Sequence, residues 1–193
     1  MIDSGEEKWA WPESPGVQCL HRPEELTIQA QPGSDLIRIP GVREIDRVCA
    51  YQRPISGDFT VTVSVSVQGE RFADAAGIVV RDGDGGWLKA AVERTRSLEW
   101  AVFTIVSLPN SDEACGAVLP AAQADLLVTR ERTRFAVLHK NADQQDWIFA
   151  RTFRWAAPET ISLGLFAQAP FSDGSFARFE HLNVSAQPMR DRR

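Results

Sequence analysis

Residues 73–93 read ADAAGIVVRDGDGGWLKAAVE, with apolar runs on either side of the segment Asp82-Gly83-Asp84-Gly85-Gly86. Glycine tolerates positive φ angles and aspartate favours tight turns, so this segment is typical of a chain reversal. Because short apolar runs on both sides of such a turn are typical of strands, the stretch predicts a β-hairpin. This hairpin is the strongest local indication of the fold.

The side chains of the predicted hairpin fall on two faces, because residues two positions apart on a strand point the same way. If the aliphatic set faces a core, the other face carries four cross-strand pairs: Arg81 with Trp87, Val79 with Lys89, Gly77 with Ala91 and Ala75 with Glu93. Small residues then form a floor beside charged groups and the indole of Trp87, which we expect to be partly exposed. Such a face would suit a polar ligand. The alternative is a solvated sheet surface with Arg81 stacked on Trp87.

The clearest alternation precedes the hairpin, where the segment from Phe59 to Val67 places an apolar residue at every second position. Strict period two with β-branched residues predicts a half-buried strand of an antiparallel sheet. Further strands are predicted at residues 26–30, 36–39, 47–52, 100–106, 126–130, 134–139, 147–153, 161–167 and 176–184, with a loop at 109–113. No window has the 3.6-residue period of a helix, so the sequence predicts an all-β sandwich or barrel.

Length and composition indicate one domain. A chain of 193 residues can bury a core of its own, and no composition shift divides it. We expect a flexible N-terminal tail over residues 1–8, a single β-sandwich domain over 9–185 and a flexible C-terminal tail over 186–193. Trp9 and Trp11 are expected in the core or at its rim, because indoles are rarely left free in water.

Charge and cysteine content argue against several classes of function. The formal net charge of −5 argues against nucleic acid and against an anionic membrane surface as partners. The three cysteines and three histidines are scattered without metal-ligand spacing, so we expect no metal, no cofactor and no disulfide framework. The first residues, MIDSGEEKWAW, contain no apolar leader segment, which predicts a cytoplasmic protein.

Several blocks of sequence, taken in order, resemble one protein family. The blocks are DAAGIVVR at 74–81, WLKAAVE at 87–93, FTIVS at 103–107 followed by Ser111-Asp112, and W-x-x-x-R from Trp147 to Arg151. They are similar to an uncharacterised bacterial and fungal family related to the yeast regulation-of-enolase protein. The resemblance implies a concanavalin A-like jelly-roll β-sandwich of two antiparallel sheets, with a ligand site on the concave sheet.

The resemblance also implies a set of ligand-binding residues. Carried over by position, these are Asp74, Arg81, Trp87, Lys89, Glu93, Ser111 and Asp112. The chain departs from the family pattern in having Ala75 for a glutamine, Ala91 for a glycine and Glu113 for an aromatic residue. In the predicted register Ala75 lies beside Glu93, so the missing amide would remove one ligand-facing group.

The predicted function is non-catalytic binding of a carbohydrate or similar polar ligand on the concave face. In this interpretation Trp87 stacks on the ligand, Lys89 and Arg81 donate hydrogen bonds, and Glu93 and Asp74 accept them. The alternative is a regulatory protein–protein interaction module, as the enolase-related family name implies. A weak glycan-processing enzyme is a third possibility.

Catalysis is not expected, because the sequence lacks a suitable pair of carboxylates. Glycoside hydrolysis needs two carboxyl groups, about 5–5.5 Å apart for retention or 6.5–9.5 Å for inversion. The strings E-x-D-x-x-E and E-x-D-x-E of glucanases with a similar fold do not occur here. Lys89 and Glu93 are separated by roughly 13 Å along a strand, so we do not expect them to form a close pair.

Overall fold

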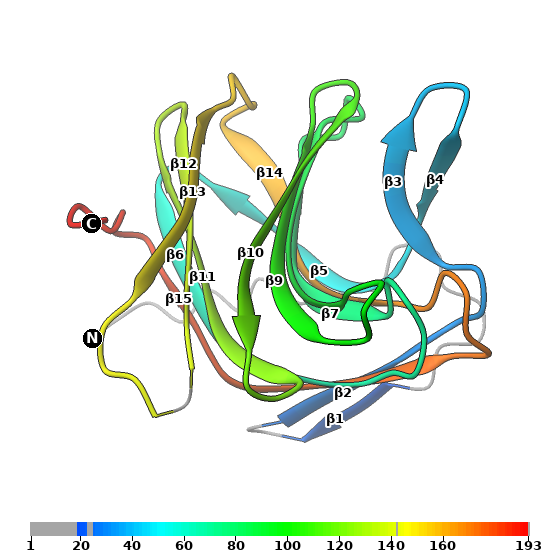
Figure 1. The fold of residues 1–193 in the computed structure, drawn as a ribbon. Coiled ribbons are helices and arrows are strands. Elements are labelled where there is room, and N and C mark those ends of the chain that lie inside the picture. Colours follow the sequence, from blue (N-terminus) through cyan, green and yellow to red (C-terminus); the bar gives the residue numbers. More distant parts are fainter. Residues whose placement is uncertain (1–18, 23–24, 142, 193) are drawn as a thin grey trace.

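The computed structural model describes residues 19–22, 25–141 and 143–192. These residues form fifteen strands and no helix, which confirms the predicted all-β fold (Figure 1). Among the residues that the structure describes, there is no helix long and apolar enough to cross a membrane.

The strands form two large antiparallel sheets that pack against each other as a sandwich (Figure 1). The seven-stranded sheet has the order β1 (Cys19–Arg22), β2 (Glu25–Ala30), β15 (Ser175–Ser185), β6 (Phe59–Gln68), β11 (Gln123–Glu131), β12 (Arg134–Lys140) and β13 (Ile148–Arg154). The six-stranded sheet has the order β10 (Ser111–Leu119), β9 (Trp100–Ser107), β8 (Trp87–Arg94), β7 (Ala75–Arg81), β14 (Thr160–Gln168) and β5 (Cys49–Ser56). A separate hairpin consists of β3 (Asp35–Ile39) and β4 (Arg43–Arg47).

The main hydrophobic core lies between the two large sheets. In β6, every second residue from Phe59 to Val67 is buried, while the Thr and Ser residues between them are half-buried. From the six-stranded sheet, Ile78 and Leu88 belong to the same core as these buried residues of β6. The alternation read from the sequence therefore assigns the inner face of β6 correctly.

The predicted register of the central hairpin is confirmed. Strands β7 and β8 pair Arg81 with Trp87, Val79 with Lys89, Gly77 with Ala91 and Ala75 with Glu93. A Cβ atom on Gly77 would clash with the carbonyl oxygen of Ala90 and lie 2.8 Å from the Cα of Ala91. Glycine at this position therefore allows the two strands to approach closely.

The outer face of the six-stranded sheet is concave, and the β3–β4 hairpin stands across it (Figure 1). Leu36 and Ile37 of β3 join Val79, Trp87 and Phe166 of the sheet in a second, smaller hydrophobic cluster. The concave face is thus partly covered by this chain's own hairpin. The sequence pattern predicts β3 but not its partner β4, and therefore does not predict this cover.

Strand β10 differs from the prediction for its part of the chain. Residues 109–113 are predicted as a loop, but β10 begins at Ser111 and pairs with β9 along its length. Seven of its nine residues are exposed, so it has none of the apolar alternation that marks a half-buried strand. The loop prediction is therefore wrong from Ser111 onward, because β10 is an edge strand.

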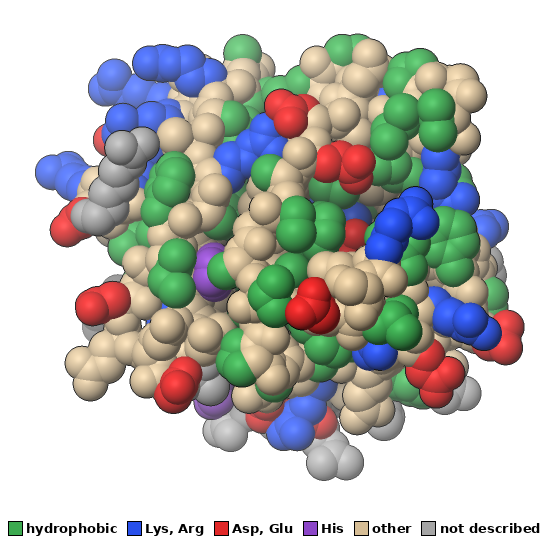
Figure 2. Space-filling model, viewed as in Figure 1, with side chains coloured by type: hydrophobic (Ala, Val, Ile, Leu, Met, Phe, Trp, Pro, Cys, Tyr) green, Lys and Arg blue, Asp and Glu red, His purple; other side chains and the backbone are tan. Residues whose placement is uncertain are grey.

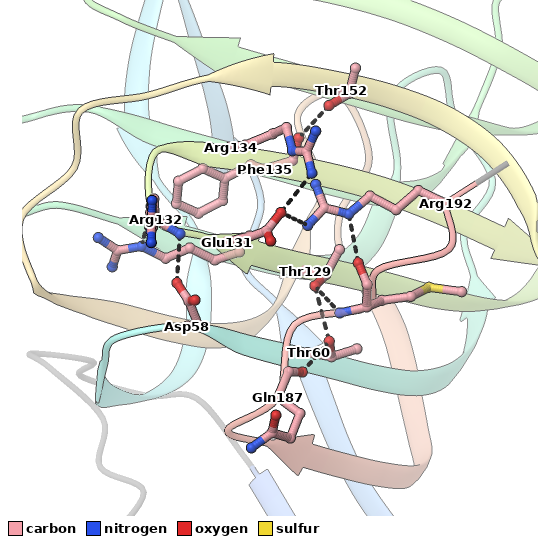
Figure 3. Close-up of polar contacts among 12 residues, drawn as sticks. Asp58, Thr60, Thr129, Glu131, Arg132, Arg134, Phe135, Thr152, Gln187 and Arg192 are labelled. Carbon is pink, nitrogen blue, oxygen red and sulfur yellow. Dashed lines mark hydrogen bonds and ion pairs between the residues drawn. The ribbon is translucent and has the colours of Figure 1, made fainter.

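The end of the chain, expected to be a flexible tail, lies against the seven-stranded sheet. Thr60 Oγ1 donates a hydrogen bond to the Gln187 carbonyl at 2.7 Å, and the Met189 N–H donates to Thr129 Oγ1 at 2.9 Å (Figure 3). The side chain of Arg192 is buried against Glu131. The expected N-terminal tail, together with Trp9 and Trp11, lies outside the described residues.

Candidate functional site

The concave face carries a buried ion pair between two residues of one strand. Lys89 and Glu93 of β8 point to the same side, and Lys89 Nζ lies 3.0 Å from Glu93 Oε2. Their side chains are only 2% and 7% exposed. The expectation that these residues would not form a close pair is wrong, because their long side chains meet over the small Ala91 between them.

Gln168 of β14 completes this group. Its Oε1 accepts a hydrogen bond from Lys89 Nζ at 3.3 Å, and its Nε2 donates to the Ala73 carbonyl at 2.9 Å. Gln168 is the cross-strand neighbour of Ala75. An amide from the adjacent strand therefore lies next to the position where the family pattern has a glutamine. We call Lys89, Glu93 and Gln168 the buried polar cluster.

Burial is the largest influence on the pKa of Glu93. Loss of solvent raises the pKa of the Glu93 carboxyl, although the adjacent Lys89 ammonium lowers it. The carboxylates of Asp35 on β3 and Glu113 on β10 raise the pKa of Glu93 further. Asp35 is itself buried and is held by Arg43 Nε at 2.9 Å. Carboxyl groups from two other strands, β3 and β10, thus act electrostatically on Glu93.

Trp87 lies toward the other end of β8, beneath the hairpin. It is 1% exposed and packs in the same cluster as Leu36 and Ile37. Its indole Nε1 is buried with no hydrogen-bond partner among the described residues. The prediction that Trp87 is partly exposed is therefore wrong, because a hairpin about fifty residues earlier in the sequence covers it.

Arg81 and Ser111 fasten the hairpin to the sheet. Arg81 Nη1 lies 2.6 Å from Asp46 Oδ1 on β4, and Arg38 Nη2 lies 3.2 Å from Asp46 Oδ2. Ser111 Oγ accepts a hydrogen bond from the backbone N–H of Arg38 at 2.8 Å. Both predicted ligand-binding residues therefore contact the cover of the concave face.

Asp74 lies just before β7 and is fully buried. Its Oδ2 accepts hydrogen bonds from the backbone N–H groups of Glu70 and Arg71 at 2.8 and 2.9 Å. Its Oδ1 accepts a hydrogen bond from Ser172 Oγ at 2.7 Å. Both carboxylate oxygens are thus used within the protein, where they fix the loop before β7.

Asp112 points to the opposite side of β10 from its neighbour Ser111, because side chains alternate along a strand. Its Oδ2 lies 2.8 Å from Arg151 Nη2 on β13, and Arg151 Nη1 also donates to the Asp112 carbonyl at 3.0 Å. Arg151 is the last residue of the W-x-x-x-R block. The structure therefore uses these two residues to join the edges of the two sheets.

An accessible rim borders the buried polar cluster on β9 and β10. Phe103 is the cross-strand neighbour of both Ala91 and Cys115. Phe103 is half-buried, whereas Glu113 and Cys115 are exposed. Figure 2 shows this flank of the molecule, where acidic and basic side chains lie among hydrophobic ones. The rim combines an aromatic ring with a carboxylate at the edge of the concave face.

Sequence reasoning missed Gln168, Asp35 and Glu113 as members of this arrangement. The available signal for Gln168 was a polar residue ending the nearly apolar segment ISLGLFAQ, since a buried amide requires partners. Asp35 and Glu113 gave no such signal, because their proximity to Glu93 depends on how the hairpin and the edge strand are placed. Among the described residues, no three His, Cys, Asp or Glu side chains are positioned to hold a metal ion.

The fold and the site define a β-sandwich whose concave sheet face is partly covered and contains buried charge. The chain belongs to the family described as protein of unknown function (DUF1349), whose sequence model matches residues 11–187. No curated protein matches the sequence. The link to enolase regulation that the resemblance implies stays a prediction.

Among solved structures, the fold is similar to a functionally unknown protein from Saccharomyces cerevisiae. That protein has a TM-score of 0.84 and 23% identity, and the match covers 93% of this chain and 96% of the yeast chain. A xylan beta-1,4-xylosidase from Bacillus halodurans C-125 matches with a TM-score of 0.65 and 14% identity, over 90% of this chain and 40% of that chain. The GH43 BlXynB protein from Bacillus licheniformis matches with a TM-score of 0.63 and 15% identity, over 92% and 35%. The chain spans less than half the length of these two bacterial proteins, and the likeness is one of fold.

Proposed function

We propose that this protein binds a carbohydrate or a similar polar ligand, without catalysis, at the end of the concave face where the buried polar cluster lies. The observation that carries the proposal is the hydrogen-bonded group of Lys89, Glu93 and Gln168 beside the small residues Ala75 and Ala91 of the same face. Sugar hydroxyls both donate and accept hydrogen bonds. An ammonium, a carboxylate and an amide placed together offer them partners of both kinds.

The energetic cost of the ion pair supports a role beyond packing. Taking two charges out of water costs several kcal/mol per ion, and well-packed apolar residues often replace such pairs without loss of stability. Ala75, Val79 and Ala91 occupy neighbouring positions of the same face without any charge. A ligand that meets Lys89 and Glu93 gives a physical reason for charge at these two positions.

The rim residues suit the approach of such a ligand. Phe103 takes the stacking role that the sequence suggests for Trp87, since Trp87 is covered by Leu36 and Ile37. Glu113 is exposed and lies close enough to influence Glu93 electrostatically. A ligand stacked on Phe103 would therefore reach the polar cluster at the edge of the hairpin.

The fold neighbours support carbohydrate as the ligand class. One is described as a xylan beta-1,4-xylosidase and another as a GH43 protein. Because one fold can host many functions, this likeness favours a class of ligand and assigns no residue a role.

The test is a glycan array probed with the complete chain, followed by calorimetric titration of each hit. We expect Phe103→Ala and Glu113→Gln to weaken binding by about tenfold each, as is typical for loss of one good contact, while the fold is retained because neither side chain is fully buried. Glu180→Gln on the seven-stranded sheet is the matched control and should bind as the parent does. No array hit, with an unchanged Tm across a panel of sugars, would contradict the proposal.

A weak glycan-processing enzyme is the second candidate, favoured by the raised pKa of Glu93 near two further carboxyls. A carboxyl whose pKa is raised by burial is better suited to act as a general acid than an exposed one. The measurement is release of reducing ends from glycans that the array identifies. Activity in the parent protein that disappears in Glu93→Gln but survives in Glu180→Gln would establish this candidate, and binding without any release would reject it.

A further inference from the structure

A pocket lies at the seven-stranded sheet, lined by residues of the β11–β12 turn, the end of β13 and the C-terminal segment. Figure 3 draws several of these residues, among them Asp58, Glu131 and Arg134. Its volume is about 560 Å³. Its charged lining consists of four arginines, Arg132, Arg134, Arg154 and Arg190, and two carboxylates, Asp58 and Glu131. Basic side chains gather at the upper left of Figure 2, on the side where Figure 1 draws the C-terminus. We call this site the arginine pocket.

Both carboxylates of the arginine pocket are already engaged. Asp58 Oδ1 accepts a hydrogen bond from the backbone N–H of Arg132 (Figure 3). Glu131 Oε2 lies 2.6 Å from Arg134 Nη2 and 3.1 Å from Arg192 Nη2. Within the described ranges, no ion pair involves the side chains of Arg132, Arg154 or Arg190. A protein with a net charge of −5 thus gathers four arginines against two carboxylates in one recess.

The backbone at Arg132 gives an independent indication. Glu131 pairs with Arg134, so Arg132 and Thr133 form a two-residue hairpin loop. Arg132 has a φ of 53°, in the left-handed region that glycine adopts without steric cost. Two-residue hairpin loops favour glycine, asparagine or aspartate at such positions. The geometry of the turn therefore favours a residue other than arginine at position 132. Binding of a ligand by the guanidinium group would explain why arginine is present there.

Positive charge is also crowded behind the pocket. The side chain of Arg192 is 8% exposed, and its Nη1 is buried with no hydrogen-bond partner among the described residues. Burial lowers the pKa of Arg192, and the neighbouring Arg134 lowers it further. An anion bound in the pocket would reduce this repulsion between guanidinium groups.

We propose that the arginine pocket binds the phosphoryl group of a small phosphorylated molecule. Guanidinium groups bind phosphate oxygens through pairs of N–H donors, which a lysine ammonium does not offer. The volume lies within the range of roughly 300–1,000 Å³ typical of small-molecule sites, so the pocket can hold more than a single phosphate ion. The phosphoryl group can come from an inorganic diphosphate or from an organic phosphate ester.

The experiment is a calorimetric titration of the complete chain with pyrophosphate and, separately, with glycerol phosphate, at constant ionic strength. We expect saturable binding of at least one of them, with a rise in Tm, and the comparison distinguishes the two sources of the phosphoryl group. The double variant Arg154→Gln/Arg190→Gln should lose about tenfold or more in affinity, because charge-assisted hydrogen bonds are removed. Arg178→Gln is the matched control, since this exposed arginine lies on β15 outside the pocket.

Arg132→Gly makes the test independent of folding defects. Glycine suits the left-handed conformation, so this variant should raise Tm while it weakens pyrophosphate binding. Binding that is absent for both probes, or that is equally strong in the arginine variants and in Arg178→Gln, would overturn the proposal. The residues of the arginine pocket differ from those of the concave face, so either result leaves the carbohydrate proposal to its own test.

Discussion

The concave face and the arginine pocket differ in how their charged side chains are stabilised. On the concave face, Lys89 and Glu93 are almost completely buried and satisfy each other at 3.0 Å. In the arginine pocket, the side chain of Arg134 is 52% exposed, and Arg132 and Arg154 are exposed and form no ion pair with any residue that the structure describes. Water screens exposed charges, so they can crowd at small cost, whereas buried charges must be paired.

Because of this difference, substitutions in the two regions should change different properties of the protein. Removing one partner of a buried pair leaves an unpaired ion in the protein interior, which is strongly destabilising. Removing an exposed arginine changes the local potential and leaves the packing intact. Variants of the concave cluster therefore report mainly on folding, and variants of the arginine pocket report mainly on ligands.

The largest effect should come from Lys89→Met, which leaves Glu93 buried without its cation. We expect a loss of about 3–5 kcal/mol in the free energy of unfolding, measured by urea denaturation. Arg178→Gln, which disrupts an exposed ion pair with Glu180, should cost about 0–1 kcal/mol.

The double variant Lys89→Met/Glu93→Leu sharpens the same comparison. Because both charges are then absent, most of the lost stability should return. A double variant as unstable as the single one would show that the ion pair is not the origin of the effect.

The next largest effect should come from Leu36→Ala, which weakens the cover of the concave face. Leu36 is fully buried against the sheet, and truncation of such a side chain costs about 3 kcal/mol. Hydrogen exchange should accelerate in β3 and β4 more than in β6, because the hairpin is held by fewer contacts than the main core. Uniform acceleration across both sheets would contradict the view of the hairpin as a separate cover.

A smaller effect of the opposite sign is expected for Arg132→Gly. Glycine adopts the left-handed conformation without the steric strain that a Cβ atom causes there. The free energy of unfolding should therefore increase by about 1 kcal/mol, measured by the same urea denaturation. Arg154→Gln, an exposed change with no alteration of backbone preference, is the control and should leave stability nearly unchanged. A destabilised Arg132→Gly would show that the arginine side chain supports the turn.

The pH dependence of stability gives the subtlest comparison. The pKa of Glu93 is raised in the folded protein, so above the ordinary carboxyl pKa of about 4.3 the folded state retains a proton that the unfolded state releases. The contribution of Glu93 to stability should therefore fall as pH rises from that value through the raised pKa. The measurement is the difference in Tm between the parent and Glu93→Gln across this range. Lys89, Asp35 and Glu113 are the charged groups that act on Glu93. Below the ordinary carboxyl pKa, Glu93 of the parent is protonated, so both proteins carry a neutral group at position 93 and the pH-dependent part of the difference should vanish.

Much of the central hairpin was predictable, because its determinants are local. The Asp-Gly run fixes the turn, and period-two alternation from Phe59 to Val67 and in β7 and β8 fixes which residues share a face. The edge strand β10 was missed because exposed strands carry no apolar pattern. The site was predictable only in part, since Lys89 and Glu93 share a face as expected, but the positions of Gln168 and Asp35 depend on strands that are distant in sequence.

The faces of the strands follow from local sequence alone, because alternation along a strand and the conformational freedom of glycine act between near neighbours in the chain. Packing between distant segments, in contrast, places the β3–β4 hairpin over Trp87 and brings a glutamine of β14 to Lys89. It also gathers arginines from the β11–β12 turn, β13 and the chain end around one pocket. Contacts of this kind arise from packing between segments many residues apart. Such contacts leave no periodic pattern in the sequence from which they could be predicted.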